Sequence, residues 1–188
     1  MFEMLLTTGN KLYLPWSGPG NKKIIKGNKE LGFFGQVTAQ ELMSYPSFFA
    51  QVAPKRGVQP GYAASAQTWF KFIYKGKVLF VPRYFIATSL SWEDLYAAGA
   101  VYGVRGPGAL PIPNGNPVDQ VKLLTVSESL NGGLKTWPLK VRLFDGANGN
   151  ATLTADYPTD QTEWDAIWNR FFTEKWDNSN WQGPVSYT

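Results

Sequence analysis

Two residue types, cysteine and histidine, are absent from the 188 residues of the chain. Without cysteine the chain can form no disulfide bond, no thiolate nucleophile, no iron–sulfur cluster and no cysteine-based zinc site. Without histidine it lacks the commonest general base and the commonest transition-metal ligand, which excludes serine–histidine and cysteine–histidine hydrolases. Catalysis would have to use lysine, tyrosine or the 14 carboxylates, and a metal site would need oxygen ligands alone. We expect no enzyme activity, no cofactor and no metal site.

Long apolar runs are also missing. The run at residues 78–81 is among the longest and is far short of the roughly 18 residues that a membrane span needs. The first six residues include Glu3, an acid where a signal peptide carries positive charge. We expect a protein that is made in a cytoplasm and is not inserted into a membrane.

Aromatic residues, in contrast, are abundant. The chain has 8 Trp, 9 Tyr and 12 Phe, which is 15% of its residues, and apolar residues make up 44%. This composition excludes an intrinsically disordered protein. The 19 Gly and 13 Pro indicate many turns and short elements. The length suffices for one large domain or two small ones.

Charge is distributed unevenly along the chain. Residues 1–90 contain 11 Lys and Arg against 3 Asp and Glu, whereas residues 91–188 contain 7 against 11. This asymmetry could orient identical subunits head to tail or place a basic face on nucleic acid, and a solvated surface without a specific partner is the plainer interpretation. Because no basic run reaches five residues, we do not expect nucleic acid as a partner.

Local patterns predict an α+β fold. A β-hairpin is expected at residues 69–82 around a turn at Lys75–Gly76, in a central position of the sheet. Further strands are expected at residues 118–126 and 139–144, followed by turn residues at 145–150. The predicted architecture is a mixed, short-stranded sheet with a central β-hairpin and about three short helices.

Capping patterns locate these helices. Thr38 with Glu41 predicts a helix through about residue 50, interrupted at Pro46. A capping box at residues 91–94 predicts a two-turn helix that ends near Gly99 and packs on the hairpin. Residues 160 and 163 are expected to cap a last helix with a broad apolar stripe. We divide the chain into an N-terminal strand or arm (1–30), a main α+β domain (31–174) and a C-terminal tail (175–188).

Residues 104–118 contain 3 Gly and 4 Pro in 15 positions. So long a loop is usually functional, an extended arm or disordered. An extended strap on a neighbouring subunit and a loop tethered within the chain both remain open. In the first case Leu110 and Ile112 are candidate interface residues.

The C-terminal tail places aromatic rings among short polar side chains. Trp176, Trp181 and Tyr187 are candidate interface residues, since large aromatics mostly serve as core or interface anchors. The same pattern suits a sugar site, for which Trp176, Asp177, Asn180 and Trp181 are the candidate contacts. A hydrolase that uses carboxylates such as Glu163 or Asp177 is a more distant alternative.

Several blocks together resemble a module of structural proteins from tailed bacteriophages. They are WFKFIYKGKVLFVP at 69–82, SW at 91–92 and AGAVYG at 98–103, with LGFFGQV at 31–37 upstream and LKVRLFDGA at 139–147 and EW at 163–164 downstream. The similarity covers roughly residues 31–168.

This resemblance implies a virion component of a tail fibre, baseplate, collar or other appendage, assembled in the bacterial host cytoplasm as a symmetric oligomer. Its partners would be copies of itself and other virion proteins, and no conserved catalysis is implied. Longer relatives continue beyond the position of Trp164 into a lectin-like region, whereas this chain ends about twenty residues later. We therefore expect a docking or decorating subunit, with a carbohydrate-binding module for host-surface attachment as the alternative.

Overall fold

The computed structural model describes residues 12–52, 67–84, 86, 90–108, 112, 115–130, 132–144, 162–164, 166–167 and 176. These residues form two antiparallel sheets and two helices. The larger sheet has the order β1-β2-β3-β4, with strands Lys26–Gly27, Leu31–Thr38, Thr68–Tyr74 and Lys77–Pro82. The smaller one pairs β5 (Leu123–Leu130) with β6 (Gly133–Lys140). The helices are α1 (Tyr45–Val52) and α2 (Trp92–Ala97).

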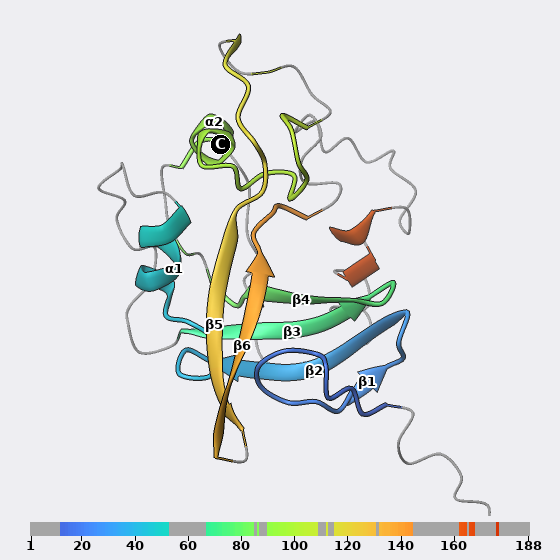
Figure 1. The fold of residues 1–188 in the computed structure, drawn as a ribbon. Coiled ribbons are helices and arrows are strands. Elements are labelled where there is room, and N and C mark those ends of the chain that lie inside the picture. The colour runs from blue at the N-terminus through green and yellow to red at the C-terminus, as the bar shows by residue number, and fades with distance from the viewer. Residues whose placement is uncertain are drawn as a thin grey trace, which may run out of the picture.

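The prediction of an α+β fold is confirmed, but the helix count differs from the expected three or so. The third predicted helix falls mostly outside the described residues, of which 163, 164, 166 and 167 are helical. The two-stranded β5–β6 ribbon crosses in front of the four-stranded sheet and its turn extends past the sheet's lower edge (Figure 1).

The predicted hairpin is present as β3 and β4, with Tyr74 opposite Lys77. Lys75 and Gly76 both have positive φ, 46° and 73°, which is the conformation of a type I′ turn. β3 is central as expected, whereas β4 lies at the edge of the sheet. β4 has apolar side chains on both faces although, among the described strands, it pairs with β3 alone. Val81 packs in the core cluster on one face of the sheet, and Phe80 packs against the cluster on the opposite face.

The capping residues after β2 do not open a helix. Glu41 accepts the backbone N–H of Thr38 at 2.8 Å and donates its own N–H to the Thr38 hydroxyl at 3.3 Å. These bonds close a turn. α1 begins only after Ser44, whose side-chain oxygen accepts an N–H of the first helical turn at 3.2 Å. The prediction that Pro46 interrupts a helix was wrong: it lies in the first turn of α1, where a backbone N–H has no intrahelical acceptor, so the N–H that proline lacks costs no hydrogen bond.

The capping box of α2 is confirmed, since Ser91 and Asp94 exchange backbone and side-chain hydrogen bonds. Gly99 follows with φ 72°, also as expected. The packing of α2 differs from the prediction. Its buried Tyr96 stacks with Trp92 at a centroid distance of 5.2 Å and donates its hydroxyl to the Pro107 carbonyl at 3.0 Å, so α2 packs on the chain that follows it rather than on the hairpin.

The ribbon is longer and differently connected than predicted. β5 starts five residues later than expected and continues to Leu130, and β6 starts six residues earlier, at Gly133. The predicted strand ended at Val126, which is followed by Ser127, Glu128 and Ser129. In the structure these polar residues belong to a strand whose inner face buries Leu124 and Val126.

Side chains from distant segments cover both faces of the four-stranded sheet. One face carries a cluster to which the C-terminal part of the chain contributes: Phe33, Phe70, Phe72, Val81, Ile167 and Trp176. On the other face, α1 and the ribbon cover Val37 and Trp69, and the N-terminal segment (residues 12–25) covers Phe34 and Ile73 with Leu14 and Ile24. The described part of the predicted N-terminal arm therefore packs on the same sheet as the main domain.

Candidate functional site

The most unusual feature of the described core is a lysine in the central strand. Lys71 is fully buried in β3. Its ammonium nitrogen donates to the Ser17 hydroxyl at 3.0 Å and to the carbonyl oxygens of Gly18 at 3.2 Å, Pro19 at 2.9 Å and Asn21 at 2.7 Å. We call these four oxygens with Lys71 the lysine cage. Because a buried charge is tolerated only when it is well hydrogen-bonded, the cage is what makes Lys71 compatible with the core.

Strand alternation and loop conformation build this cage. Successive side chains of a strand face opposite sides, so Lys71 points away from the phenyl cluster that contains Phe70 and Phe72. The rings of Phe34 and Phe80 lie 4.8 Å and 5.7 Å from its nitrogen, close enough for a cation–π attraction. The loop itself needs glycine, because Gly20 has φ 74° and a Cβ there would lie 2.7 Å from a methyl group of Val37.

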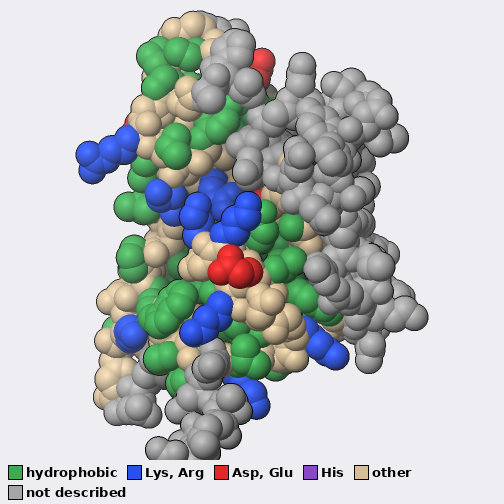
Figure 2. All heavy atoms as spheres, turned by 90° about the vertical axis from the view of Figure 1, so that its right-hand side faces the viewer, with side chains coloured by type: hydrophobic (Ala, Val, Ile, Leu, Met, Phe, Trp, Pro, Cys, Tyr) green, Lys and Arg blue, Asp and Glu red, His purple; other side chains and the backbone are tan. Residues whose placement is uncertain are grey.

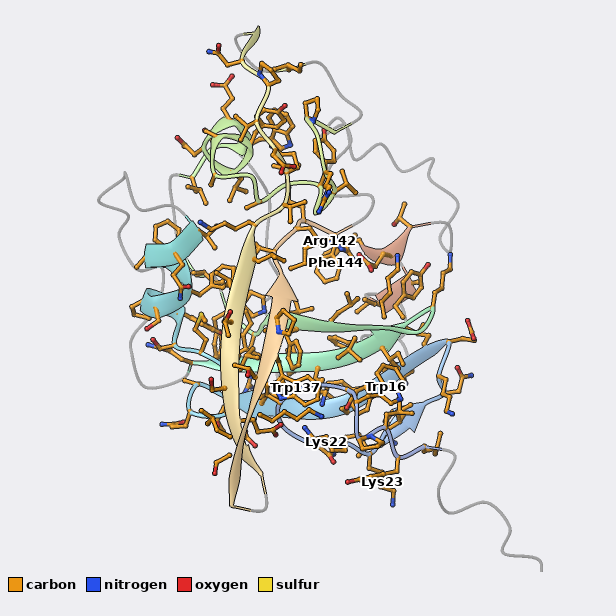
Figure 3. All side chains as sticks on the ribbon, in the orientation of Figure 1. Trp16, Lys22, Lys23, Trp137, Arg142 and Phe144 are labelled. Atoms are coloured by element: carbon orange, nitrogen blue, oxygen red, sulfur yellow. The ribbon has the colours of Figure 1, made fainter. Side chains whose placement is uncertain are left out.

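A second polar group ties the same loop to the ribbon. The Glu128 carboxylate of β5 accepts from Lys22 at 2.9 Å, from the Gly20 N–H at 3.2 Å and from the Trp137 indole at 3.1 Å. Lys22 also donates to the Gly18 carbonyl of the cage. Two ammonium groups lie over the Trp137 ring, that of Lys135 at 3.9 Å and that of Lys22 at 5.3 Å from its centroid. The N-terminal segment, β3 and the ribbon thus form one connected network, whose labelled members lie where the ribbon meets the segment (Figure 3).

The electrostatic environment of Lys71 opposes its charge. Burial, followed by the positive charge of Lys22, lowers the pKa of Lys71 from 10.5 to about 7, and the carboxylates of Glu128 and Glu41 offset part of this effect. The folded protein therefore binds the Lys71 proton less tightly than the unfolded chain does.

The free energy of unfolding is expected to rise between pH 7 and about pH 9, because the unfolded chain keeps the Lys71 proton in this range while the folded chain loses it. The contribution reaches at most about 1.4 kcal/mol per pH unit. It is measured by urea denaturation of the wild type and of a Lys71→Met variant across this range, which lies below the titration of tyrosine. The wild-type profile should rise relative to that of the variant, and parallel profiles would contradict the prediction.

The lysine cage holds the N-terminal segment on the sheet and takes no part in a reaction, because the fully buried Lys71 cannot contact a substrate. What it holds in place is the outer face of the N-terminal segment. Tyr13, Trp16 and Ile25 are each about half exposed there, at 50%, 52% and 50%. They are among the few large hydrophobic side chains that the described surface leaves uncovered.

A buried ion pair on the other side of the sheet accounts for Glu163. Its carboxylate binds the Arg142 guanidinium through two hydrogen bonds of 2.5 Å and 2.6 Å, and it is almost fully buried. Figure 3 shows Arg142 beside Phe144, just beyond the end of β6. Glu163 therefore has a structural partner and no access to a substrate. Within the part of the chain that the structure describes, no cluster of three or more acidic side chains could hold a metal ion.

The predicted site residues have separate outcomes. Trp176 is a correction: its ring is 7% exposed and stacks with Phe33 at 6.5 Å, so it anchors the core and offers no face to a sugar or a neighbouring subunit. Ile112 is half-buried and accepts the Gly115 N–H at 3.2 Å. The other predicted residues lie outside the described ones and stay predictions: Leu110, Asp177, Asn180, Trp181 and Tyr187.

The loop at 104–118 is held by its own chain in its described parts. The Gly106 N–H donates to the Asp119 carboxylate at 2.9 Å, and the Gly106 carbonyl accepts the Gln120 N–H at 3.1 Å. These contacts favour the tethered loop over the strap for the residues near both ends.

Sequence reasoning missed the network around Lys71 entirely. Its one local signal was a single lysine inside the apolar stretch 69–74. Three of the four partners in the cage are backbone carbonyls and the fourth is a serine hydroxyl, all 50 or more residues away, so no side-chain pattern predicts them.

Comparison of the chain with protein-family models, with curated proteins and with solved structures finds no match. No helix in the described ranges is long and apolar enough to cross a membrane.

Proposed function

We propose that this chain is a structural subunit of a tailed-bacteriophage virion that assembles with copies of itself and other virion proteins through the open edge of β5. The resemblance of the sequence blocks to phage structural proteins supports the virion setting. The single observation that carries the mode of assembly is a long, unprotected strand edge.

The pairing pattern of the ribbon defines this edge. Leu130 and Gly133 close the hairpin, and in such a ladder every second residue exchanges hydrogen bonds with the partner strand. The remaining residues of β5 direct their N–H and C=O groups away from β6: Leu123, Thr125, Ser127 and Ser129. Among the described strands β6 alone pairs with β5, so these backbone groups form a template for another strand.

The two edges of the ribbon differ in protection. On β6 the outward position opposite Thr125 is Pro138, which has no N–H to offer and is typical of an edge that avoids pairing. β5 contains no proline, lysine or arginine over its eight residues. Strand addition is therefore expected on the β5 side.

Two exposed leucines of the ribbon offer apolar surface to an added strand or a neighbouring subunit. Leu123 is 57% exposed and Leu134, near the turn of the ribbon, is 75% exposed. A two-stranded ribbon is marginally stable by itself, and a strand added at this edge would extend its sheet and bring its own side chains beside Leu123. A second copy is the occupant we propose, because β5 against β5 is a self-complementary pairing that closes about a two-fold axis.

A proline at Ser127 is expected to abolish self-association. The Ser127 N–H points outward, so a proline there removes no hydrogen bond of the ribbon but blocks a strand at the β5 edge. Thr136→Pro is the matched control, because Thr136 lies directly opposite Ser127 and its N–H points to the other edge.

Analytical ultracentrifugation of the wild type and both variants provides the test. The wild type and Thr136→Pro should be oligomers and Ser127→Pro a monomer with an unchanged circular dichroism spectrum. A monomeric wild type, or an oligomer that Ser127→Pro leaves intact, overturns the assembly mode. Absence of the chain from purified phage particles, measured by mass spectrometry, overturns the virion setting.

A further inference from the structure

The outer face of the N-terminal segment is a second surface that neither the core nor the ribbon uses. Tyr13 forms an isolated antiparallel bridge with Lys23, which places their side chains on the same side. Ile25 lies two residues further along and is exposed as well. Trp16, in the turn that follows Tyr13, is exposed too. We call Tyr13, Trp16, Lys23 and Ile25 the aromatic–lysine face.

This face and its surroundings carry more lysine than acid. The described residues 12–30 contain one acid, Glu30, and four lysines, of which Lys22 is paired with Glu128: Lys22, Lys23, Lys26 and Lys29. The neighbouring turn adds Lys75 and Lys77, because the Lys75 N–H donates to the Glu30 carbonyl at 2.7 Å and so brings the two turns together. Figure 2, which views the right-hand side of Figure 1, shows Lys and Arg side chains above and below a cluster of acidic side chains, with hydrophobic side chains among them.

The chemistry of these side chains favours a lipid surface over a protein or a nucleic acid. Protein interfaces are enriched in arginine and depleted in lysine, and the described residues of this face include no arginine. Nucleic-acid surfaces use aromatic stacking and phosphate contacts, in which an exposed Ile25 has no part. Tryptophan, tyrosine and aliphatic side chains flanked by lysine are the combination that partitions into the interface of an anionic bilayer.

We propose that the aromatic–lysine face adsorbs to membranes that carry anionic headgroups. Trp16, Tyr13 and Ile25 enter the headgroup region, and Lys23, Lys26 and Lys29 bind the negative surface. The lysine cage keeps Trp16 presented, since its oxygens come from the residues that directly follow Trp16. This adsorption is independent of the β5 edge.

Vesicle flotation of the full chain tests the proposal. The two probes are vesicles of phosphatidylcholine alone and vesicles that also contain phosphatidylglycerol. The chain should float with the anionic vesicles and remain behind with the neutral ones, and added salt should weaken binding because the attraction is electrostatic. Equal binding to both vesicles, or to neither, overturns the proposal.

Variants locate the binding surface. Trp16→Ala should reduce partitioning at least about tenfold, through the lost burial of the indole. Lys23→Glu should reduce it about twentyfold or more, because it removes one attractive charge, worth about fivefold, and adds a repulsive one. Lys140→Glu changes net charge equally on an exposed position of the ribbon and should have a much smaller effect.

Two further outcomes separate this proposal from its alternatives. Ser127→Pro should bind vesicles as the wild type does, even if it loses self-association, so the two proposals fail separately. If a single-stranded DNA oligonucleotide binds more tightly than anionic vesicles and Trp16→Ala removes that binding, the face is a nucleic-acid surface and the lipid proposal is wrong.

Discussion

A Lys71→Met variant is expected to lose about 3 kcal/mol of unfolding free energy at neutral pH, the loss expected when buried oxygens are left without a donor. Methionine preserves the volume and the apolar contacts with Phe34 and Phe80, so the change isolates the hydrogen bonds of the lysine cage. Removal of the ammonium relieves the cost of burying a charge. We expect the loss of hydrogen bonds to outweigh this gain, because Ser17 and Pro19 are buried and no other described donor is in place for the Ser17 hydroxyl and the Pro19 carbonyl.

Urea denaturation of the variant beside Lys77→Met measures this effect. Lys77 lies in the same hairpin and is exposed, so its replacement should change the unfolding free energy by no more than about 0.5 kcal/mol. Limited proteolysis should also cut the Lys71→Met variant faster within the N-terminal segment. Equal stability of the two variants would show that the cage contributes nothing net and that the desolvation cost of Lys71 balances its hydrogen bonds.

The sequence predicted those elements whose determinants are local. The β3–β4 hairpin is specified by Lys75–Gly76 between two apolar stretches, and α2 by Ser91, Asp94 and Gly99. In each case a turn or a cap is completed within a few residues, so no distant part of the chain is needed to form it.

The predictions that failed depended on distant contacts. Thr38 and Glu41 form the same hydrogen bonds in a turn as in a capping box, and the packing of the residues after Glu41 decides between the two. In β5, the polar residues Ser127, Glu128 and Ser129 belong to the strand because β6 pairs with them, and this pairing depends on residues further along the chain.

The aromatic residues show the same limit. Abundant rings suggested contacts between subunits, and Trp176 was a candidate for such a contact. In the described part of the chain many of the rings pack on one another within the chain, as in the pairs Phe33 with Phe72 at 5.1 Å and Tyr45 with Trp69 at 5.2 Å. Composition gives the number of anchors but not whether they lie in the core or on the surface; the exposed Trp16 was not among the candidates.

Replacement of Arg142 by methionine is expected to lower the free energy of unfolding by about 3–5 kcal/mol. Glu163 is 3% exposed, and loss of Arg142 leaves its carboxylate buried without the cation that binds it through two hydrogen bonds. The pair joins the chain just after β6 to the helical residues near Ile167, which cover one face of the sheet. Its loss should therefore also expose the cluster around Phe33 and Phe72.

A double-mutant cycle separates the ion pair from the rest of the arginine's packing. Glu163→Gln removes the charge but keeps the size, so the double variant Arg142→Met with Glu163→Gln should recover part of the loss, by at least about 1 kcal/mol. Arg105→Met, at an exposed arginine, is the control and should change stability by less than about 0.5 kcal/mol. If the two single effects simply add in the double variant, the pair has no coupling energy and the C-terminal cover of the sheet is held by apolar contacts alone.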